Sequence, residues 1–326
     1  MPEKTEKTNT EMKKIMLSGV KPTGRPHIGN YFGAMRQFVE MQDQYETYVM
    51  IADLHALTTV QNREEMKEQI IGVALDYLAI GLDPAKVTIF KQSDVPAHTE
   101  LAWIFDCITT VPYLERAHAF KDAEAKNKEI SVGVFNYPML MAADILLYDA
   151  DVVPVGQDQK QHIEITRDTA EKFNRIFGET FKLPKPVIIA DMALVPGIDG
   201  QKMSKSYKNT IPLFATDDEI QKLVMSIVTD SLTNTPTNVY EIHRLFRSEV
   251  ELEKVYIEKR GQYKVLKETL IADIIAFIKP LREKRAALEE GTPHILDILY
   301  NGGEKARSVA SKKMEKVHEL TGTKLY

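Results

Sequence analysis

The sequence predicts an α/β protein, with a Rossmann-like parallel sheet that forms a nucleotide-binding domain and a C-terminal domain built only of helices. Three observations support this prediction. Short apolar strands alternate with helical segments through the first two thirds of the chain, which is typical of βαβ units. Strand signals disappear after Asp217, where the remaining segments have helical spacing. The length of 326 residues also favours two domains.

Each element is expected from a local signal. Apolar runs bounded by turn residues indicate strands, and Phe32, Met35 and Phe38 lie on one side of the first helix. Asn62 followed by Glu65 indicates a capping box that opens a long helix. In chain order we expect a strand, a loop rich in Pro and Gly, a helix, a strand, the capped helix, a strand, two helices and two strands, over residues 15–19, 21–30, 30–45, 47–57, 62–82, 86–92, 99–110, 137–148, 151–156 and 185–192.

The chain is expected to have three regions: a flexible lead over residues 1–14, a Rossmann-like catalytic domain over 15–218 and a helical domain over 219–326. The lead lacks the apolar core of a secretory signal, and no apolar run reaches the roughly 18 residues that a membrane span needs. The single cysteine, Cys107, allows no internal disulfide and suits a reducing cytosol. The sequence therefore predicts a cytoplasmic protein with no membrane partner.

Charge is unevenly distributed along the chain. The net charge of -5 argues against a general basic coat for nucleic acid. However, residues 219–326 contain 18 Lys and Arg against 16 Asp and Glu, whereas residues 1–218 contain 24 against 31. A basic face for RNA is therefore possible on the helical part, although such runs are often merely solvent-exposed. The candidates are Lys279, Arg282, Lys284, Arg285 and the segment from Lys305 to Lys316.

A loop with the sequence PTGRPHIGN, residues 22–30, lies between the first strand and the first helix. Gly24 and Gly29 allow close backbone approach, and the helix start at Asn30 offers free N–H groups and the positive end of the helix dipole. The side chains of His27 and Asn30 can donate hydrogen bonds to a phosphate. The loop is a candidate polyphosphate site, although a plain βα turn with a helix-capping Asn explains this segment alone equally well.

A second loop, KMSKS at residues 202–206, follows a segment rich in Gly. The ammonium groups of Lys202 and Lys205 and the hydroxyl of Ser204 could close on phosphates. Mobile cations there would stabilise the charge that develops on a transferring phosphoryl group. A lone KxxK loop is usually only solvent-exposed. The combination of this loop with HIGN after the first strand is far more specific than either segment.

Together the two loops resemble the paired signatures of class I aminoacyl-tRNA synthetases, with HIGN in place of the more usual HIGH. From about Ile15 onward, nearly the whole chain is similar to the bacterial tryptophanyl-tRNA synthetase family. The middle of the three matching stretches is the most specific and distinguishes this family from the tyrosyl enzymes. The stretches are SGVKPTGRPHIGNYFGAMRQF, YPMLMAADILLYDADVVPVGQDQKQHIEITRD and GQKMSKSY.

The resemblance implies an ATP-dependent ligase that activates L-tryptophan as tryptophanyl-adenylate and then charges the 3′ end of tRNA(Trp). It also implies a homodimer, anticodon reading by the helical domain, and Mg²⁺ bound only through the ATP phosphates, without a metal site in the protein. The implied catalytic residues are His27, Asn30, Lys202, Ser204 and Lys205. ATP is expected to contact Lys21, Thr23, Gly29, Asn30, Gly33, Gly156, Asp158, Lys202, Met203, Ser204 and Lys205.

Asp144 is the implied reader of the tryptophan side chain. It lies in the apolar run MLMAADILLY, where a buried carboxylate is costly without a partner. Because an indole N–H only donates, an acceptor among apolar neighbours suits it. An Asp satisfied by a helix dipole or a neighbouring Arg is the alternative. The resemblance also implies tryptophan contacts from Leu17, His55, Tyr137, Met141, Val153, Val155 and Gln159.

Several positions depart from the family pattern. Leu17 stands where some relatives have Phe, Lys21 where many have Gln, and Gln157 where many have Glu. The lysine that contacts phosphate in some relatives could be Lys121 or Lys126.

Three other functions are weighed. The nearest is a tyrosyl-tRNA synthetase, against which the context of Asp144 speaks. A nucleotidyltransferase with an HxGH-like loop would need neither KMSKS nor a helical domain. A paralogue that binds RNA or tryptophan without catalysis is opposed by the intact His27, Lys202 and Lys205. The remaining histidines, among them His98, are expected at the surface or in local hydrogen bonds.

Overall fold

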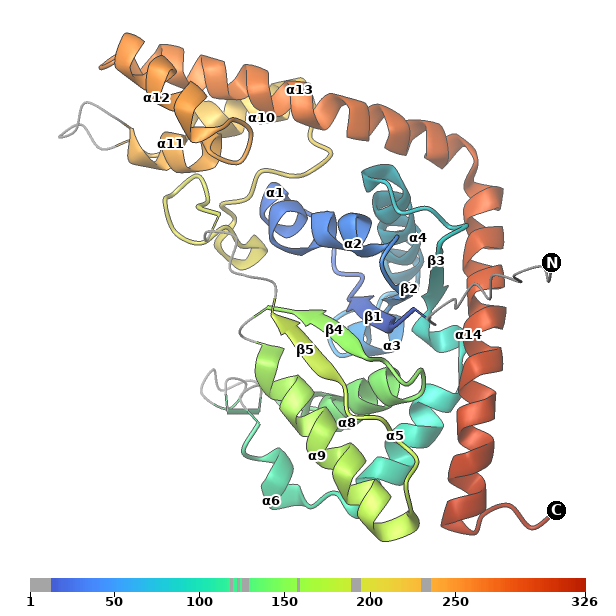
Figure 1. The fold of residues 1–326 in the computed structure, drawn as a ribbon. Coiled ribbons are helices and arrows are strands. Elements are labelled where there is room, and N and C mark those ends of the chain that lie inside the picture. Colours follow the sequence, from blue (N-terminus) through green and yellow to red (C-terminus); the bar gives the residue numbers. More distant parts are fainter. Residues whose placement is uncertain are drawn as a thin grey trace, which may run out of the picture.

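The computed structural model describes residues 13–117, 120–121, 124, 129–156, 159–188, 195–229 and 236–326. Within these residues helices surround a parallel sheet (Figure 1), which confirms the predicted α/β class. In spatial order the strands are β3 (Val87–Lys91), β2 (Glu46–Ile51), β1 (Ile15–Val20), β4 (Val152–Val155) and β5 (Lys185–Ile188).

The strand order places a topological switch point between β1 and β4. β1 pairs with β2 from Ile15 opposite Glu46 to Val20 opposite Ile51, and its other edge pairs with β4. In sheets of this kind, ligands bind outside the carboxyl ends of the strands at the switch point. The site is therefore expected beside Val20 and Val155.

Both faces of the sheet are buried, because side chains that alternate along the strands enter two separate cores. Tyr48 and Met50 of β2 enter one core, and Val49 and Ile51 enter the other. Burial on both faces explains why the strands are continuous apolar runs. The first core includes α5 (Ala97–Ile108), α8 (Val132–Leu146) and α9 (Lys160–Phe177); the second includes α1 (Ile28–Asn30), a π-helix (Tyr31–Met35), α2 (Arg36–Met41) and α4 (Arg63–Ile80).

The strand predicted over residues 47–57 is shorter in the structure. It ends at Ile51, and the short helix α3 (Asp53–Ala56) follows. The carboxylate of Asp53 accepts a hydrogen bond from the backbone N–H of Ser93 at 2.9 Å, next to the end of β3. Such side-chain bonds to the backbone compete with a strand ladder. The turn into α3 brings His55 to the carboxyl edge of the sheet.

Two helices also differ from their predicted form. The helix expected to begin at Tyr137 begins five residues earlier, because the hydroxyl of Ser131 accepts a hydrogen bond from the backbone N–H of Val134 at 3.3 Å. Pro138 therefore lies inside α8, where it has no N–H to donate. The helix expected over residues 30–45 contains the π-helix between α1 and α2, a form that is frequent at functional sites.

The C-terminal helices form an arm that folds back on the sheet (Figure 1). Gly302 allows the last helix to approach the edge strand β3 closely, since a Cβ there would lie 1.9 Å from the carbonyl oxygen of Ile89. No helix in the described ranges is both long and apolar enough to cross a membrane. These helices are α10 (Asp217–Met225), α11 (Thr237–His243), α12 (Glu249–Glu258), α13 (Tyr263–Glu290) and α14 (Thr292–Thr321).

Several basic side chains that were candidates for an RNA-binding face instead bind acidic groups within the chain. Arg285 Nε lies 2.7 Å from Asp76 Oδ1, and Lys313 Nζ lies 2.7 Å from Asp149 Oδ1. Arg282 likewise bonds to the carboxylate of Asp217 at 2.7 Å. Arg285 and Lys313 fasten the arm to the rest of the protein, whereas Arg282 joins two helices of the arm to each other. The exposed basic candidates include Lys284, Lys312 and Lys316.

The substitution Gly302→Ala is expected to destabilise the fold, because the added Cβ meets a backbone oxygen that cannot rotate away. Overpacking of this kind costs about 1–3 kcal/mol. Gly72→Ala in the middle of α4 is the matched control, since its Cβ would lie 3.8 Å from Arg285 and alanine favours a helix. Calorimetry should give a lower Tm for Gly302→Ala and an unchanged or higher Tm for Gly72→Ala. A wild-type Tm for Gly302→Ala would contradict the close approach.

Candidate active site

A cavity of about 620 Å³ lies beside the carboxyl ends of β1, β2 and β4, at the switch point of the sheet. Both apolar and polar side chains form its wall. Val155 is the exception among the residues predicted to contact tryptophan, because it is buried in the adjoining core and is not part of the described wall. The predicted residues that line the cavity are Leu17, His55, Tyr137, Met141, Asp144, Val153 and Gln159, together with Lys21 from the predicted ATP set.

Asp144 is buried in this wall, with 2% of its surface exposed. Its Oδ2 lies 2.9 Å from His55 Nε2, and its Oδ1 lies 2.7 Å from Gln92 Nε2 and 2.6 Å from His98 Nδ1. Burial by itself raises the pKa of a carboxyl group, but hydrogen bonds from His55 and His98 outweigh it and lower the pKa of Asp144 to about 2. The carboxylate is therefore charged at neutral pH.

The Asp144 carboxylate keeps acceptor capacity toward the cavity. Its two oxygens offer about four lone-pair positions. Among the described residues, the side-chain donors occupy two positions on Oδ1 and one on Oδ2. One position on Oδ2 is then left for a ligand. A flat, apolar ligand with a single N–H donor would satisfy it while packing against Met141 and Leu17 in the same wall.

His98 and Gln92 belong to this network, although the sequence did not point to either. The expectation that His98 lies at the surface or in a local hydrogen bond is wrong: it is fully buried, and its Nε2 lies 2.9 Å from the hydroxyl of Tyr148, 50 residues away. His98 therefore lies between the carboxylate of Asp144 and the hydroxyl of Tyr148. Gln92 directly follows β3, and a polar residue at a strand end was the one signal available.

A second polar pair lines the cavity. The hydroxyl of Tyr137 is hydrogen-bonded to Nε2 of His162, and their ring centroids are 5.4 Å apart. Tyr137, Met141 and Asp144 lie on successive turns of α8, so a single helix face supplies all three. His162 comes from α9 and was not predicted.

The first loop, residues 22–30, is built around His27. The side-chain oxygen of Asn30 accepts a hydrogen bond from the backbone N–H of His27 at 3.0 Å, and its NH₂ group can donate to a ligand. A Cβ on Gly29 would lie 2.9 Å from Nδ1 of His27, so any larger residue would displace the imidazole. Burial, together with the positive charge of Lys205, lowers the pKa of His27 to about 4. His27 is therefore neutral at physiological pH and acts through hydrogen bonds.

Lys205 connects the second loop to the first. Its ammonium donates hydrogen bonds to the backbone carbonyls of Thr23 at 2.7 Å and Gly24 at 2.9 Å. Burial lowers the pKa of Lys205 from its ordinary value. The lysine of one predicted phosphate loop is thus bound directly to the other loop.

Backbone pairing joins the first loop to the segment that follows the second loop. Ile28 N–H donates to the carbonyl of Ile211 at 3.0 Å, and Leu213 N–H donates to the carbonyl of Pro26 at 2.9 Å. The second loop and the first loop are therefore neighbours although more than 170 residues separate them in the sequence. The structure brings together the motifs that the sequence paired.

The other predicted residues of the second loop have different environments. Met203 is buried, and its sulfur lies 3.5 Å from the position of a Cβ on Gly29. Lys202 is exposed, and the hydroxyl of Ser204 lies 2.9 Å from that of Ser206. Lys202 and Ser204 are thus available to a ligand, while Met203 anchors the loop.

The remaining predicted ATP residues lie around these loops. Lys21 donates to the hydroxyl of Thr58 at 3.0 Å in the cavity wall. Gly33 has open space where a Cβ would stand, and Gly156 directly follows β4. Lys121 is exposed. The described residues do not include Lys126, Gln157 and Asp158.

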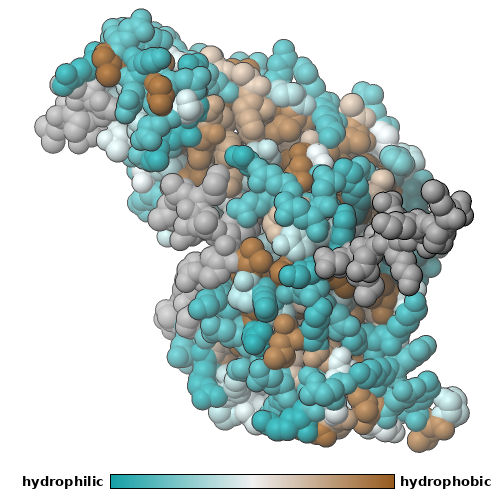
Figure 2. Space-filling model, viewed as in Figure 1, coloured by the Kyte–Doolittle hydropathy of each residue, from teal (hydrophilic) through white to brown (hydrophobic). Residues whose placement is uncertain are grey.

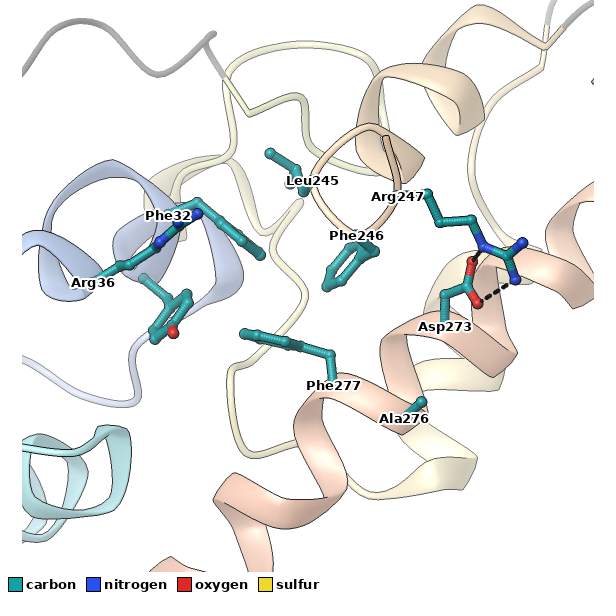
Figure 3. Close-up of a pocket in the computed structure, with 9 residues that line it drawn as sticks. Phe32, Arg36, Leu245, Phe246, Arg247, Asp273, Ala276 and Phe277 are labelled. Carbon is teal, nitrogen blue, oxygen red and sulfur yellow. Dashed lines mark hydrogen bonds and ion pairs between the residues drawn. The ribbon is translucent and has the colours of Figure 1, made fainter. Parts of the chain in front are cut away.

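A second cavity, of about 450 Å³, lies between the π-helix and α13 (Figure 3). Phe32, Phe246 and Phe277 face one another there, with ring centroids 5.3 to 5.4 Å apart. Asp273 bonds to the guanidinium of Arg247 at 2.7 Å on the far side. Hydrophobic residues gather where the arm meets the body (Figure 2). Because the rings contact each other, we interpret them as apolar packing between the π-helix and the C-terminal arm.

The cavity beside Asp144 and the two adjoining loops form two chemically different sites. The first cavity offers an apolar wall with one buried anionic acceptor. The adjoining loops offer ammonium groups, N–H donors and a neutral imidazole, which suit a polyphosphate. Among the described residues there is no group of three or more His, Cys, Asp or Glu side chains that could hold a metal ion.

The chain is similar in sequence to known proteins over nearly its whole length. Residues 9–290 match the family model of class I tRNA synthetases for W and Y. The tryptophan–tRNA ligase of Fusobacterium nucleatum is 50% identical, over 95% of this chain and 98% of that protein. The corresponding ligase of Rhodopirellula baltica is 46% identical, over 94% and 99%.

A solved structure agrees with these sequence relatives. The tryptophanyl-tRNA synthetase from Campylobacter jejuni, complexed with ADP and tryptophan, superposes with a TM-score of 0.89 at 42% identity. The alignment covers 94% of this chain and 99% of that one.

The low pKa of His27 predicts a pH dependence of stability. Because the folded-state value of about 4 lies below the ordinary 6.5, the unfolded chain binds protons more readily between these values. The stability associated with neutral His27 is fully present above pH 6.5 and decreases as the pH falls toward 4. Urea unfolding at about pH 7.5 and pH 5 should show a smaller loss for His27→Gln than for the wild type. The exposed His294→Gln is the control, and an undiminished loss in His27→Gln would refute the burial argument.

Proposed function

The chain belongs to the class I tRNA synthetases for tryptophan and tyrosine, and we propose that it is the tryptophan–tRNA ligase of that family. The observation on which this proposal rests is the buried, charged carboxylate of Asp144, which lines the cavity beside Met141 and Leu17. An anionic acceptor beside apolar side chains suits the N–H of an indole ring. Full-length similarity to tryptophan–tRNA ligases supports tryptophan over tyrosine.

In the activation step a carboxylate oxygen of tryptophan attacks the α-phosphorus of ATP. A new P–O bond forms tryptophanyl-adenylate, and the bond to the β-phosphate breaks to release pyrophosphate. Lys202 and Lys205 stabilise the charge that moves onto the pyrophosphate, with Ser204 as a further donor. His27 and Asn30 bind the phosphates as neutral donors, in agreement with the low pKa of His27.

The position of Lys205 is suited to this role before ATP binds. Its ammonium already lies against the carbonyls of Thr23 and Gly24. Phosphates that enter beside the first loop would meet a cation at short range. The rest of the proposed ATP site is formed by Lys21, Gly29, Gly33, Gly156, Asp158 and Met203. Mg²⁺ enters with the phosphates of ATP and needs no ligand set of its own in the protein.

In the second step a hydroxyl of the terminal tRNA ribose attacks the carbonyl carbon of the adenylate, and AMP leaves. We assign this chemistry to a catalytic domain over residues 15–218 and the anticodon contact to a helical domain over 219–326, where Lys284, Lys312 and Lys316 are exposed. Charging of tRNA also agrees with a cytoplasmic location.

A homodimer is part of the proposal. Trp103, the only tryptophan of the chain, is 70% exposed on α5, and Val132 at the start of the adjoining α8 is 80% exposed. Large apolar side chains at this exposure suit a protein interface. Sedimentation velocity of the wild type tests the assembly.

The proposed substrate is tested by ATP–pyrophosphate exchange with each amino acid in turn. We expect exchange with tryptophan alone for the wild type. In Asp144→Asn the indole loses its charged acceptor, so the preference for tryptophan over phenylalanine should fall by at least about tenfold. Asp106→Asn, at a half-buried carboxylate outside the described cavity wall, should keep wild-type selectivity. Exchange with tyrosine but not tryptophan would refute the assignment, and none with any amino acid would favour the non-catalytic paralogue.

The role of Lys205 predicts a separation of rate from binding. Lys205→Ala should slow tryptophan-dependent exchange by about 10²- to 10³-fold, because the lost cation acts mainly in the transition state. The Kd for tryptophan in equilibrium dialysis should stay near the wild-type value, since the Asp144 cavity is intact. Lys222→Ala, at an exposed lysine of α10, is the charge-matched control. A parallel loss of rate and tryptophan affinity would contradict this role.

A further inference from the structure

We propose that Asn209 is a positioning residue for tryptophan activation: its buried side-chain amide fixes the backbone of the KMSKS loop so that Lys202, Ser204 and Lys205 face the phosphates. This inference rests on the proposed function. Asn209 lies outside both loop motifs, and its amide is not directed at the cavity beside Asp144.

The amide of Asn209 bonds to the second loop and to Asp199, which precedes that loop. Nδ2 donates to Asp199 Oδ1 at 2.7 Å and to the carbonyl of Lys202 at 3.1 Å, and Oδ1 accepts from the backbone N–H of Ser204 at 2.7 Å. The residue is 2% exposed. A buried amide with all three bonds made holds its partners in one geometry, since breaking any bond leaves an unsatisfied polar group.

The chain before the motif is folded tightly around this side chain. Met203 N–H donates to the carbonyl of Val195 at 2.8 Å, which closes a hairpin over residues 195–203. The first arm of the hairpin bonds to Asn209 as well, because Ile198 N–H donates to its backbone carbonyl at 3.0 Å. A Cβ on Gly197 would lie 2.3 Å from Cγ of Asn209, so only glycine fits beside the amide.

Asn209 also joins the loop to a fixed support. Two residues later, Ile211 accepts a hydrogen bond from Ile28 of the first loop. The bond between Ser204 and Asn209 closes a short ring of chain that contains the 3-10 turn Lys205–Tyr207. Lys205 thus lies in a short ring of chain that the bond between Ser204 and Asn209 closes. The backbone bond from Ile28 to Ile211 attaches this ring to the first loop.

Loss of the Asn209 amide should slow catalysis, because the groups of the KMSKS loop would move away from the phosphates. A displacement of about 1 Å in a catalytic group can cost about 10²-fold in rate. Without the amide, the carbonyl of Lys202 and the N–H of Ser204 lose their common partner, and the two lysines sample other positions. The tryptophan cavity consists of other elements, so its affinity should not change. A purely structural role would instead lower stability without this separation.

The test compares three proteins with the wild type in tryptophan-dependent ATP–pyrophosphate exchange. Asn209→Ala should lower kcat by about 10- to 10²-fold with an unchanged KM for tryptophan. Asn209→Asp keeps the shape but sets a second carboxylate beside Asp199, so its loss should be at least as large. The double variant Asp199→Asn with Asn209→Asp restores one amide–carboxylate bond in the reverse direction. It should recover at least about tenfold over Asn209→Asp alone.

Asn238→Ala is the matched control. Its amide donates to the carbonyl of Val228 at 2.9 Å and lies beside the hairpin, where a Cβ on Gly200 would be 2.7 Å from Nδ2. Its bond thus goes to Val228 and not to the backbone of residues 202–206. We expect wild-type kcat. A wild-type kcat for Asn209→Ala, an equal loss of tryptophan affinity, or no recovery in the double variant would overturn the proposal.

Trypsin cleavage after Lys202 and Lys205 gives a readout that does not depend on activity. Asn209→Ala should speed this cleavage by about tenfold, because the loop opens more often, and the double variant should slow it again. Unchanged cleavage would show that Asn209 does not hold the loop. A wild type that is inactive with every amino acid would reject the proposed function, while the cleavage rates would still decide the role of Asn209.

Discussion

A charged carboxylate buried in an apolar wall sets conditions that the surrounding structure must meet. Asp144 needs donors on several sides, since an unpaired buried charge is very costly. His55 comes from the turn after β2, Gln92 from the end of β3 and His98 from α5. They can converge only because parallel strands end at one edge of the sheet. The strand order and the short α3 thus bring the donors around the carboxylate of Asp144.

The two proposed phosphate loops, residues 22–30 and 202–206, are far apart in the sequence and must be brought together by the fold. Backbone bonds at Pro26 and Ile28, and the bonds of Lys205 to Thr23 and Gly24, fix their separation before any ligand binds. Catalysis by positioning depends on such preorganisation, since little then has to move during the reaction. The proposed site thus has the cavity with Asp144 on one side and, on the other, Lys205 held against the first loop.

Local patterns were enough to predict the parallel sheet and both loops, because strand and helix periods and turn residues are local properties. The residues of the cavity wall followed from the resemblance to the family and not from local patterns. The start of α8 was misplaced because Pro138 suggested a first turn, whereas the cap is Ser131. His98 and Gln92 were missed because their partners lie 46 or more positions away, and no local pattern records such a distance. The partners of Asn209 are close in sequence, but its proposed role depends on the hairpin over residues 195–203, which no local sequence pattern indicated.

The contact between α14 and β3 also bears on how the protein is made. β3 is the edge strand of the sheet, and an uncovered edge is a template for pairing with other chains. Gly302 lets α14 lie directly against that edge, but α14 leaves the ribosome long after β3. During synthesis the edge of the sheet is therefore uncovered until α14 arrives, and a chain truncated before α14 would keep that edge open to pairing with other chains.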